Sequence, residues 1–159
     1  MKKIFLTFAA LCAMSAQAQL FVGGTGRFGY ADNTFVLSAL PEAGYEFNEY
    51  WAVGGSLGFS MAAHDGVYTY GVVEPFARFT PWHNERIALD IKGGAEFTFS
   101  DYLAGCELGF RPSMRFFVND HFDVFADLGL IGVSYDGEDW SPAFLVTGCN
   151  VHLGVSYKF

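Results

Sequence analysis

The chain ends in Val151-His152-Leu153-Gly154-Val155-Ser156-Tyr157-Lys158-Phe159, where apolar side chains alternate with polar or small ones. A period of two is typical of a β-strand that has one apolar face and one polar face. The same period continues through most of the chain that precedes this segment. The sequence therefore predicts an all-β protein whose strands have two chemically different faces.

Turn residues divide the rest of the chain into segments of similar length. The predicted strands are 20–30, 34–47, 50–62, 67–80, 86–99, 103–118, 122–135 and 144–159. The connections between them are short, and Asp-Gly or Asn-Asp pairs in three of them favour tight hairpins. Consecutive strands are therefore expected to be antiparallel neighbours. Pro41, Pro75 and Pro112 occupy similar places in three strands and predict a bend repeated around a closed sheet.

The charged residues of the predicted strands all fall on one face, together with many glycines and serines. That face holds Arg27, Glu42, Glu46, Glu74, Arg78, Asp90, Lys92, Glu96, Glu107, Arg111, Arg115, Asp123, Asp127 and Lys158. The apolar face carries Phe28, Phe35, Tyr45, Phe47, Trp51, Phe59, Phe79, Phe97, Phe99, Phe110, Phe116, Phe122, Tyr157 and Phe159. The interior of an eight-stranded barrel is only just wide enough to be filled by side chains, so these rings are expected to face outward.

Most of these rings lie near strand ends, whereas leucines such as Leu57, Leu89 and Leu128 are placed in the middle. Two aromatic girdles around an apolar band are typical of a barrel in a lipid bilayer. The pattern therefore predicts an eight-stranded antiparallel up-and-down transmembrane β-barrel. The inward charges, six basic and eight acidic, are expected to pair with one another and close the lumen.

The N-terminal residues have the three zones of a secretory signal peptide. Lys2 and Lys3 precede an apolar run of about eleven residues, too short to span a bilayer as a helix, and Ala16-Gln17-Ala18 follows it. We expect residues 1–18 to be removed and residues 19–159 to form the barrel domain. The mature chain would have seven basic residues against 17 acidic ones, which disfavours nucleic acid as a partner.

With these features the chain resembles the small outer-membrane β-barrels of Gram-negative bacteria, of the OmpA and OmpX transmembrane type and of the PorT-like "outer membrane protein β-barrel" families. The residues that carry the resemblance are the signal segment, the alternating strands, the proline repeats and the terminal strand. In these families the last strand is similar to the signal read by the barrel-assembly machinery. The resemblance implies that Val155, Tyr157 and Phe159 are that signal here.

The resemblance implies an outer-membrane location, lipid and the assembly machinery as partners, and a monomer. Because such barrels have many roles, the function stays open between classes. We expect a structural or interaction role with a closed lumen and no enzymatic activity. One alternative is a narrow, porin-like diffusion channel. Another is an acyltransferase resembling the PagP type of barrel, for which His64, Asp65, Ser100 and Asp101 are the loop candidates.

No cofactor or metal site is expected. Residues 24–29 match the letters of a G-x-G-x-x-G motif, but no predicted helix follows to bind a phosphate. A metal would need His83 and His121 to meet across two turns, and His152 is expected to be a hydrogen-bonded residue of the lumen. Cys106 and Cys149 are predicted two strands apart, too far for a disulfide, and are therefore expected to be separate thiols.

Overall fold

The computed structural model describes residues 19–31, 34–63, 66–100, 104–135, 139–145 and 151–159. Its strands are β1 (Gln19–Ala31), β2 (Thr34–Glu46), β3 (Trp51–Ala63), β4 (Val67–His83), β5 (Ile87–Phe99), β6 (Ala104–Phe117), β7 (Phe122–Leu128), β8 (Leu130–Tyr135), β9 (Trp140–Leu145) and β10 (Val151–Lys158). In this part of the chain no helix is long and apolar enough to cross a membrane.

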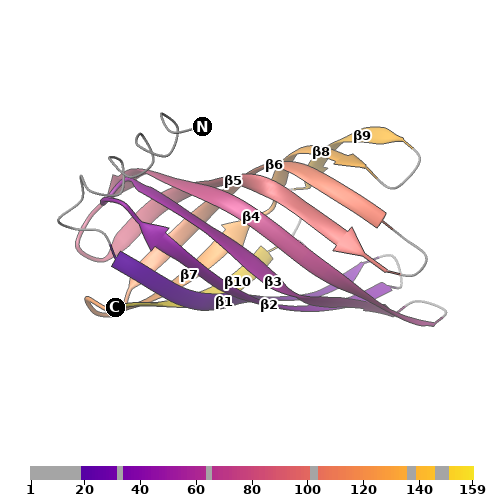
Figure 1. Ribbon diagram of the computed structural model, residues 1–159, viewed down its shortest axis with the longest axis horizontal. Coiled ribbons are helices and arrows are strands. Elements are labelled where there is room, and N and C mark those ends of the chain that lie inside the picture. Colours follow the sequence, from indigo (N-terminus) through magenta and orange to yellow (C-terminus); the bar gives the residue numbers. More distant parts are fainter. Residues whose placement is uncertain (1–18, 32–33, 64–65, 101–103, 136–138, 146–150) are drawn as a thin grey trace, which may run out of the picture.

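The strands close into a barrel, which confirms the predicted all-β fold with eight antiparallel barrel strands (Figure 1). Neighbours in the chain pair from β1 to β6, and β10 pairs with β1 to complete the ring. The seventh barrel strand consists of β7 and β8, separated by Gly129 with a φ of 83°, which a glycine adopts without strain. The eighth consists of β9 and β10.

Two predicted strand boundaries are wrong. β4 runs through Pro81 to His83, with a register shift between Phe79 and Trp82, whereas a turn was expected to begin at Pro81. The shift lets the strand pass a residue that cannot donate a ladder hydrogen bond. At the other end of the barrel, β9 already begins at Trp140 rather than at residue 144.

The three prolines of the predicted repeat interrupt one ladder each. Pairing is absent at Leu40 and Pro41 between β2 and β3, at Glu74 and Pro75 between β4 and β5, and at Arg111 and Pro112 between β6 and its β7–β8 neighbour. Proline has no N–H to donate, which explains each gap. The register resumes unchanged after the first two gaps. Across the third gap, Phe110 and Ser113 are three residues apart on β6, whereas their partners Ile131 and Asp127 are four residues apart. The partner strand therefore has one extra residue at this point.

The two ends of the barrel differ in their connections. The termini end carries Gln19 and Phe159 and the turns 47–50, 84–86 and 118–121, whereas the loop end carries the connections around residues 32–33, 64–66, 100–103 and 136–139 (Figure 1). Each turn at the termini end is built on one asparagine. The Oδ1 atoms of Asn48, Asn84 and Asn119 each accept hydrogen bonds of 2.8 to 2.9 Å from the backbone N–H groups two and three residues later.

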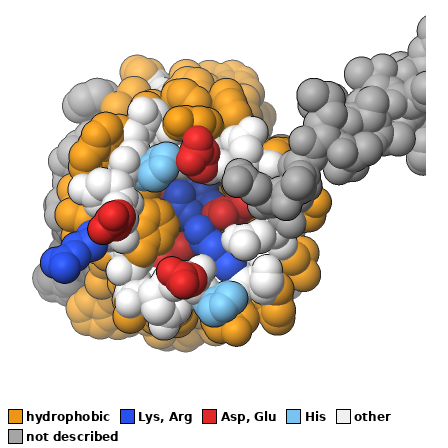
Figure 2. All heavy atoms as spheres, turned by 90° about the vertical axis from the view of Figure 1, so that its left-hand side faces the viewer, with side chains coloured by type: hydrophobic (Ala, Val, Ile, Leu, Met, Phe, Trp, Pro, Cys, Tyr) orange, Lys and Arg blue, Asp and Glu red, His pale blue; other side chains and the backbone are white. Residues whose placement is uncertain are grey.

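The inside and the outside of the barrel have opposite chemistry. Seen from the termini end, charged side chains lie within the ring of strands and hydrophobic ones surround it (Figure 2). Nine of the rings predicted to face outward are exposed: Phe28, Trp51, Phe59, Phe97, Phe99, Phe110, Phe116, Tyr157 and Phe159. Buried charged residues alternate with these exposed positions along the strands.

Among the described residues, three phenylalanines are buried inside the barrel, and each one covers a glycine directly across the ladder. Phe21 pairs with Gly44, Phe76 with Gly54 and Phe125 with Gly154. A Cβ atom on any of these glycines would come within 2.4 to 2.7 Å of the facing ring. The small residues of the inner face thus make room for buried rings.

Candidate functional site: the charged lumen

All fourteen charged residues that were predicted to face inward lie on the inner face of the barrel. Nine of them are buried, namely Glu42, Glu74, Arg78, Asp90, Lys92, Arg111, Arg115, Asp123 and Asp127. Arg27, Glu46, Glu96 and Glu107 are half-buried nearer the two mouths, and Lys158 also points inward. Successive side chains of a strand alternate between its two faces, and the charged residues of most strands occupy the inward positions. The closed sheet therefore brings these charges together in the lumen.

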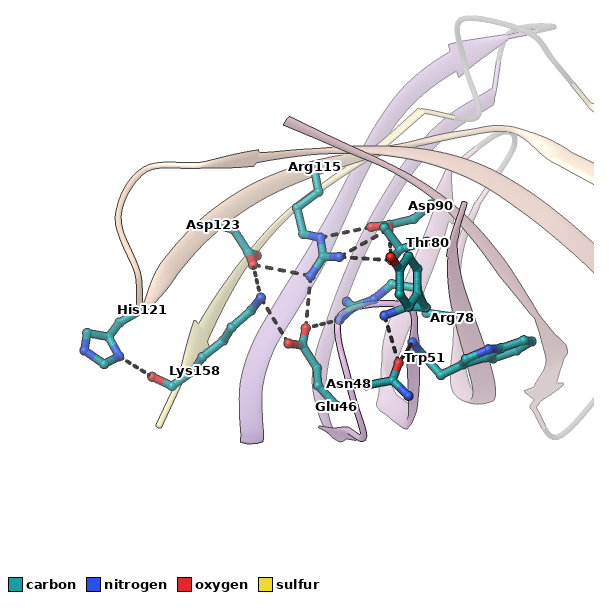
Figure 3. Close-up of polar contacts among 11 residues, drawn as sticks. Glu46, Asn48, Trp51, Arg78, Thr80, Asp90, Arg115, His121, Asp123 and Lys158 are labelled. Atoms are coloured by element: carbon teal, nitrogen blue, oxygen red, sulfur yellow. Dashed lines mark hydrogen bonds and ion pairs between the residues drawn. The ribbon is translucent and has the colours of Figure 1, made fainter. Parts of the chain in front are cut away.

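Near the termini end, Arg115 is the centre of a network that joins four strands (Figure 3). Its guanidinium lies 3.0 Å from Asp90 on β5, 3.0 Å from Glu46 on β2 and 3.7 Å from Asp123 on β7. The Thr80 hydroxyl donates a hydrogen bond to the same Asp90. One arginine on β6 is therefore held by carboxylates from three other strands.

Glu46 contacts two further cationic side chains in this network. Its carboxylate accepts a hydrogen bond from Arg78 on β4 and lies 3.1 Å from the Lys158 ammonium on β10. Lys158 also lies 3.5 Å from Asp123 (Figure 3). Strands far apart in the sequence are thus cross-linked by charge-assisted contacts.

Deeper in the lumen, two cations share five carboxylates. The Lys92 ammonium lies 3.5 Å from Glu42 and 3.8 Å from both Glu74 and Asp127. Arg111 pairs with Glu74, and its Nη2 atom lies 2.7 Å from Glu96 and 3.5 Å from Glu107.

The buried phenylalanine rings fill the space beside these pairs. The Lys92 ammonium lies 4.1 Å from the centre of the Phe76 ring, and the Arg78 guanidinium lies 5.1 Å from the centre of the Phe21 ring. The cavity lined by Glu42, Phe76, Lys92, Phe125 and Asp127, among others, has a volume of only about 10 Å³. Such a space holds about one water molecule, so the middle of the lumen is constricted.

Wider cavities open at the two ends. At the termini end, a cavity of about 430 Å³ is lined by Glu46, Asn48, Arg115 and Lys158, among others. At the loop end, a cavity of about 600 Å³ is lined by Arg27, Tyr68, Tyr70, Glu96 and Glu107, among others. We call the second one the loop-end cavity. Below it, Arg27 points a guanidinium nitrogen at the Nε2 atom of His152, 3.5 Å away, so His152 is the inward residue that was expected.

The histidines of the termini-end turns lie apart and contact different partners. His83 is 3.6 Å from Glu49 and meets the Tyr50 ring edge-to-face, whereas His121 contacts the Lys158 carbonyl oxygen and stacks on Tyr157. Within the described ranges, no group of three or more His, Cys, Asp or Glu residues could hold a metal ion.

The remaining candidates are the two cysteines, the loop residues considered for acyl transfer and the assembly signal. Cys106 is a free, half-exposed thiol on β6, and Cys149 lies outside the described residues. Ser100 lines the loop-end cavity, but the other loop candidates, His64, Asp65 and Asp101, also lie outside the described residues. The proposed assembly-signal residues Val155, Tyr157 and Phe159 all lie exposed on the outer face.

Sequence reasoning missed three features: two inward rings, two buried hydroxyl donors and the asparagine turns. Phe76 alternates with Glu74 and Arg78, and Phe125 lies between Asp123 and Asp127, so parity alone places both rings inside. Thr80 and Ser56 supply hydroxyl donors to buried carboxylates. A four-residue pattern could have revealed the asparagine turns. In it, Asn is followed by an acidic residue, then by any residue, then by an apolar one, and it occurs at 48–51, 84–87 and 119–122.

Comparison with known proteins adds no identification to this geometry. No protein-family model matches the chain, and a search of curated protein sequences also found no match. The fold class and the charged lumen therefore rest on the residues of this chain.

Proposed function

We propose that this protein is an integral β-barrel of the outer membrane of a Gram-negative bacterium, with a structural or interaction role and a lumen closed by ion pairs. The observation that carries the proposal is the distribution of side chains, with large apolar residues exposed around the barrel and charges buried inside it. In water such an outer surface would be costly, whereas in lipid it is the stable arrangement. The resemblance to the OmpA, OmpX and PorT-like barrels supports the same conclusion.

The proposal includes export and assembly. Residues 1–18 would direct secretion and be removed, and the exposed apolar positions of β10 would be read by the barrel-assembly machinery. Lipid would then cover the apolar belt around each barrel, so the proposed form is a monomer. The proposed role needs no cofactor and no catalytic step.

A closed lumen is favoured over a diffusion channel because cationic and acidic side chains from most of the strands meet at the constriction. Separating a buried pair to let ions pass would leave unpaired charges in a narrow space. The loop-end and termini-end cavities are then two mouths that a plug of ion pairs keeps apart.

Single-channel recording tests the plug directly. Wild-type protein refolded and inserted into a planar bilayer is expected to show no stable open channel at moderate voltage, because the ion pairs occupy the lumen. A variant in which Arg78, Arg111 and Arg115 are all replaced by Ala is the comparison, and it is expected to admit ions where it inserts. Steady, ion-selective current through the wild-type protein would instead establish the narrow channel.

Assembly in cells tests the membrane location. Replacement of Phe159 by Asp is expected to reduce strongly the amount of barrel in the outer-membrane fraction, while refolding in detergent stays nearly unchanged. The Phe159 ring is exposed, with 64% of its surface accessible, so its loss removes little internal packing.

A matched control for Phe159→Asp is Phe116→Asp, which changes an exposed ring on β6 at the same end of the barrel. If the control and Phe159→Asp reduced the outer-membrane amount equally, the terminal strand would have no special role as a signal. Wild-type protein that fractionates with soluble proteins would contradict the membrane location itself.

A further inference from the structure

The loop-end cavity has the size and the closure of a binding site for a small molecule. Its volume of about 600 Å³ lies within the range of ligand pockets, roughly 300–1,000 Å³. Its inward-facing lining comes from β1, β3, β4, β5, β6 and β8. The ion pairs of Arg111 and Lys92 close it from below, so it is a blind cup whatever the role of the barrel.

Two carboxylates form the floor of this cup. Glu96 and Glu107 are direct partners across the β5–β6 ladder, and both side chains point inward. Like charges placed opposite each other are destabilising unless a cation lies beside them. Among the described residues, Arg111 is the cation that pairs with them, and the same guanidinium also binds Glu74. One third of the Glu107 side chain is exposed, so this carboxylate is open to a second cation from above.

Tyrosine rings form one wall. Tyr68 and Tyr70 alternate with outward residues on β4 and line the same cavity as Glu96. The register puts them three and two inward positions nearer the loop end than Glu96, because Val73 is the partner of Phe97. The Tyr70 hydroxyl accepts a hydrogen bond of 3.1 Å from Ser60, which orients the ring. The face of a tyrosine ring attracts an ammonium group through its negative charge density. Arg27 also lines the cup, where one of its guanidinium nitrogens lies 3.5 Å from His152 and its charge also attracts the Glu107 carboxylate.

The sign of the charge around the mouth favours the same ligand. The sequence connections at the loop end contain no lysine or arginine, and their acidic residues are Asp32, Asp65, Asp101, Asp136, Glu138 and Asp139. Acidic connections of this kind raise the local concentration of cations. The lining of the proposed site itself consists of described residues.

We propose that the loop-end cavity binds a small organic cation, whose ammonium group lies against Glu107 and Glu96 and whose carbon chain lies against Tyr68 and Tyr70. An aliphatic amine fits this lining better than a metal ion, because the cup offers two carboxylates and aromatic faces rather than a full set of metal ligands. The site does not depend on the role of the barrel in the membrane.

Calorimetric titration of the refolded full barrel in detergent tests the site, with 1,4-diaminobutane as the probe. We expect saturable binding that weakens as salt is added, and no binding of succinate or glucose. Glu107→Gln is expected to raise the Kd of the diamine roughly tenfold or more, because a charge-assisted contact is lost. Tyr68→Leu is expected to raise it about two- to fivefold.

Glu85→Gln is the matched control, since it removes one exposed carboxylate at the opposite end of the barrel. It is expected to leave the Kd unchanged. The proposal is overturned if the wild type does not bind the diamine, if Glu85→Gln weakens binding as much as Glu107→Gln, or if succinate or glucose binds equally well. Should Glu107→Gln fail to refold, Tyr68→Leu at the mouth decides, and an unchanged Kd for it contradicts the site.

Discussion

Replacement of Arg115 by Ala is expected to lower the free energy of unfolding of the barrel by about 3–5 kcal/mol, the cost of removing one partner from a buried ion pair. The guanidinium is buried and satisfies Asp90, Glu46 and Asp123 at once (Figure 3). Its removal leaves Asp90 and Asp123, each about 1% exposed in their side chains, with less compensation for their charge. Equilibrium unfolding in urea, with the barrel in lipid vesicles, measures the loss.

Arg86→Ala provides the control, because Arg86 lies exposed in the 84–86 turn, and its effect is expected to stay below about 1 kcal/mol. Adding Asp90→Asn to Arg115→Ala is expected to recover part of the stability, since it removes one of the stranded charges. A loss for Arg115→Ala no larger than that for Arg86→Ala would mean that water screens the network. The lumen would then be wet, and the closed plug would have to be abandoned.

The faces of the strands were predictable because alternation is a local property. Each strand shows its own register through its charged residues, as in Glu74, Phe76 and Arg78 on β4, without knowledge of its neighbours. The number of barrel strands followed from the turn residues between them. By contrast, Pro81 was read as a turn because proline usually ends a central strand, yet a register shift lets β4 continue past it.

The pairing of charges was not predictable in the same way. Which carboxylate Arg115 reaches depends on the stagger of the strands around the barrel, and stagger is a property of the closed sheet. Arg115 reaches Glu46, which lies 69 residues away in the sequence on a strand that is not its neighbour. The sequence predicted that the inward charges pair, but only the closed barrel shows the partners.

The buried rings show a further limit of counting side chains by size. The rings of the apolar face are predicted to lie outside because the interior of a small barrel is narrow, and that prediction does not assign Phe21, Phe76 or Phe125 to either face. Phe21, Phe76 and Phe125 fit inside because each one faces a glycine across the ladder. Alternation places Phe76 and Phe125 on the inner face, but the glycines that make room for them are known only from the cross-strand register.

The second large effect is expected on the outer face. Leu57→Arg should lower the free energy of unfolding in lipid vesicles by about 2–4 kcal/mol, the cost of a basic side chain at the bilayer midplane. Leu57 lies at the centre of β3, and two thirds of its surface is exposed. An exposed leucine makes little internal packing, so the medium outside the barrel decides the size of the effect.

Leu89→Arg is the control for Leu57→Arg, because the two leucines lie at different distances from the end of the barrel. The sequence predicts Leu89 at mid-depth, but it lies two residues after the start of β5 and pairs with exposed Trp82, so it lies close to the termini end of the barrel. Leu89→Arg is therefore expected to cost only about 0–1 kcal/mol, as basic residues do near the interface. In water neither arginine would be penalised, since both positions are exposed. Equal tolerance of arginine at Leu57 and Leu89 would mean that lipid does not surround the barrel, whereas a graded cost would locate the bilayer midplane near the centre of β3.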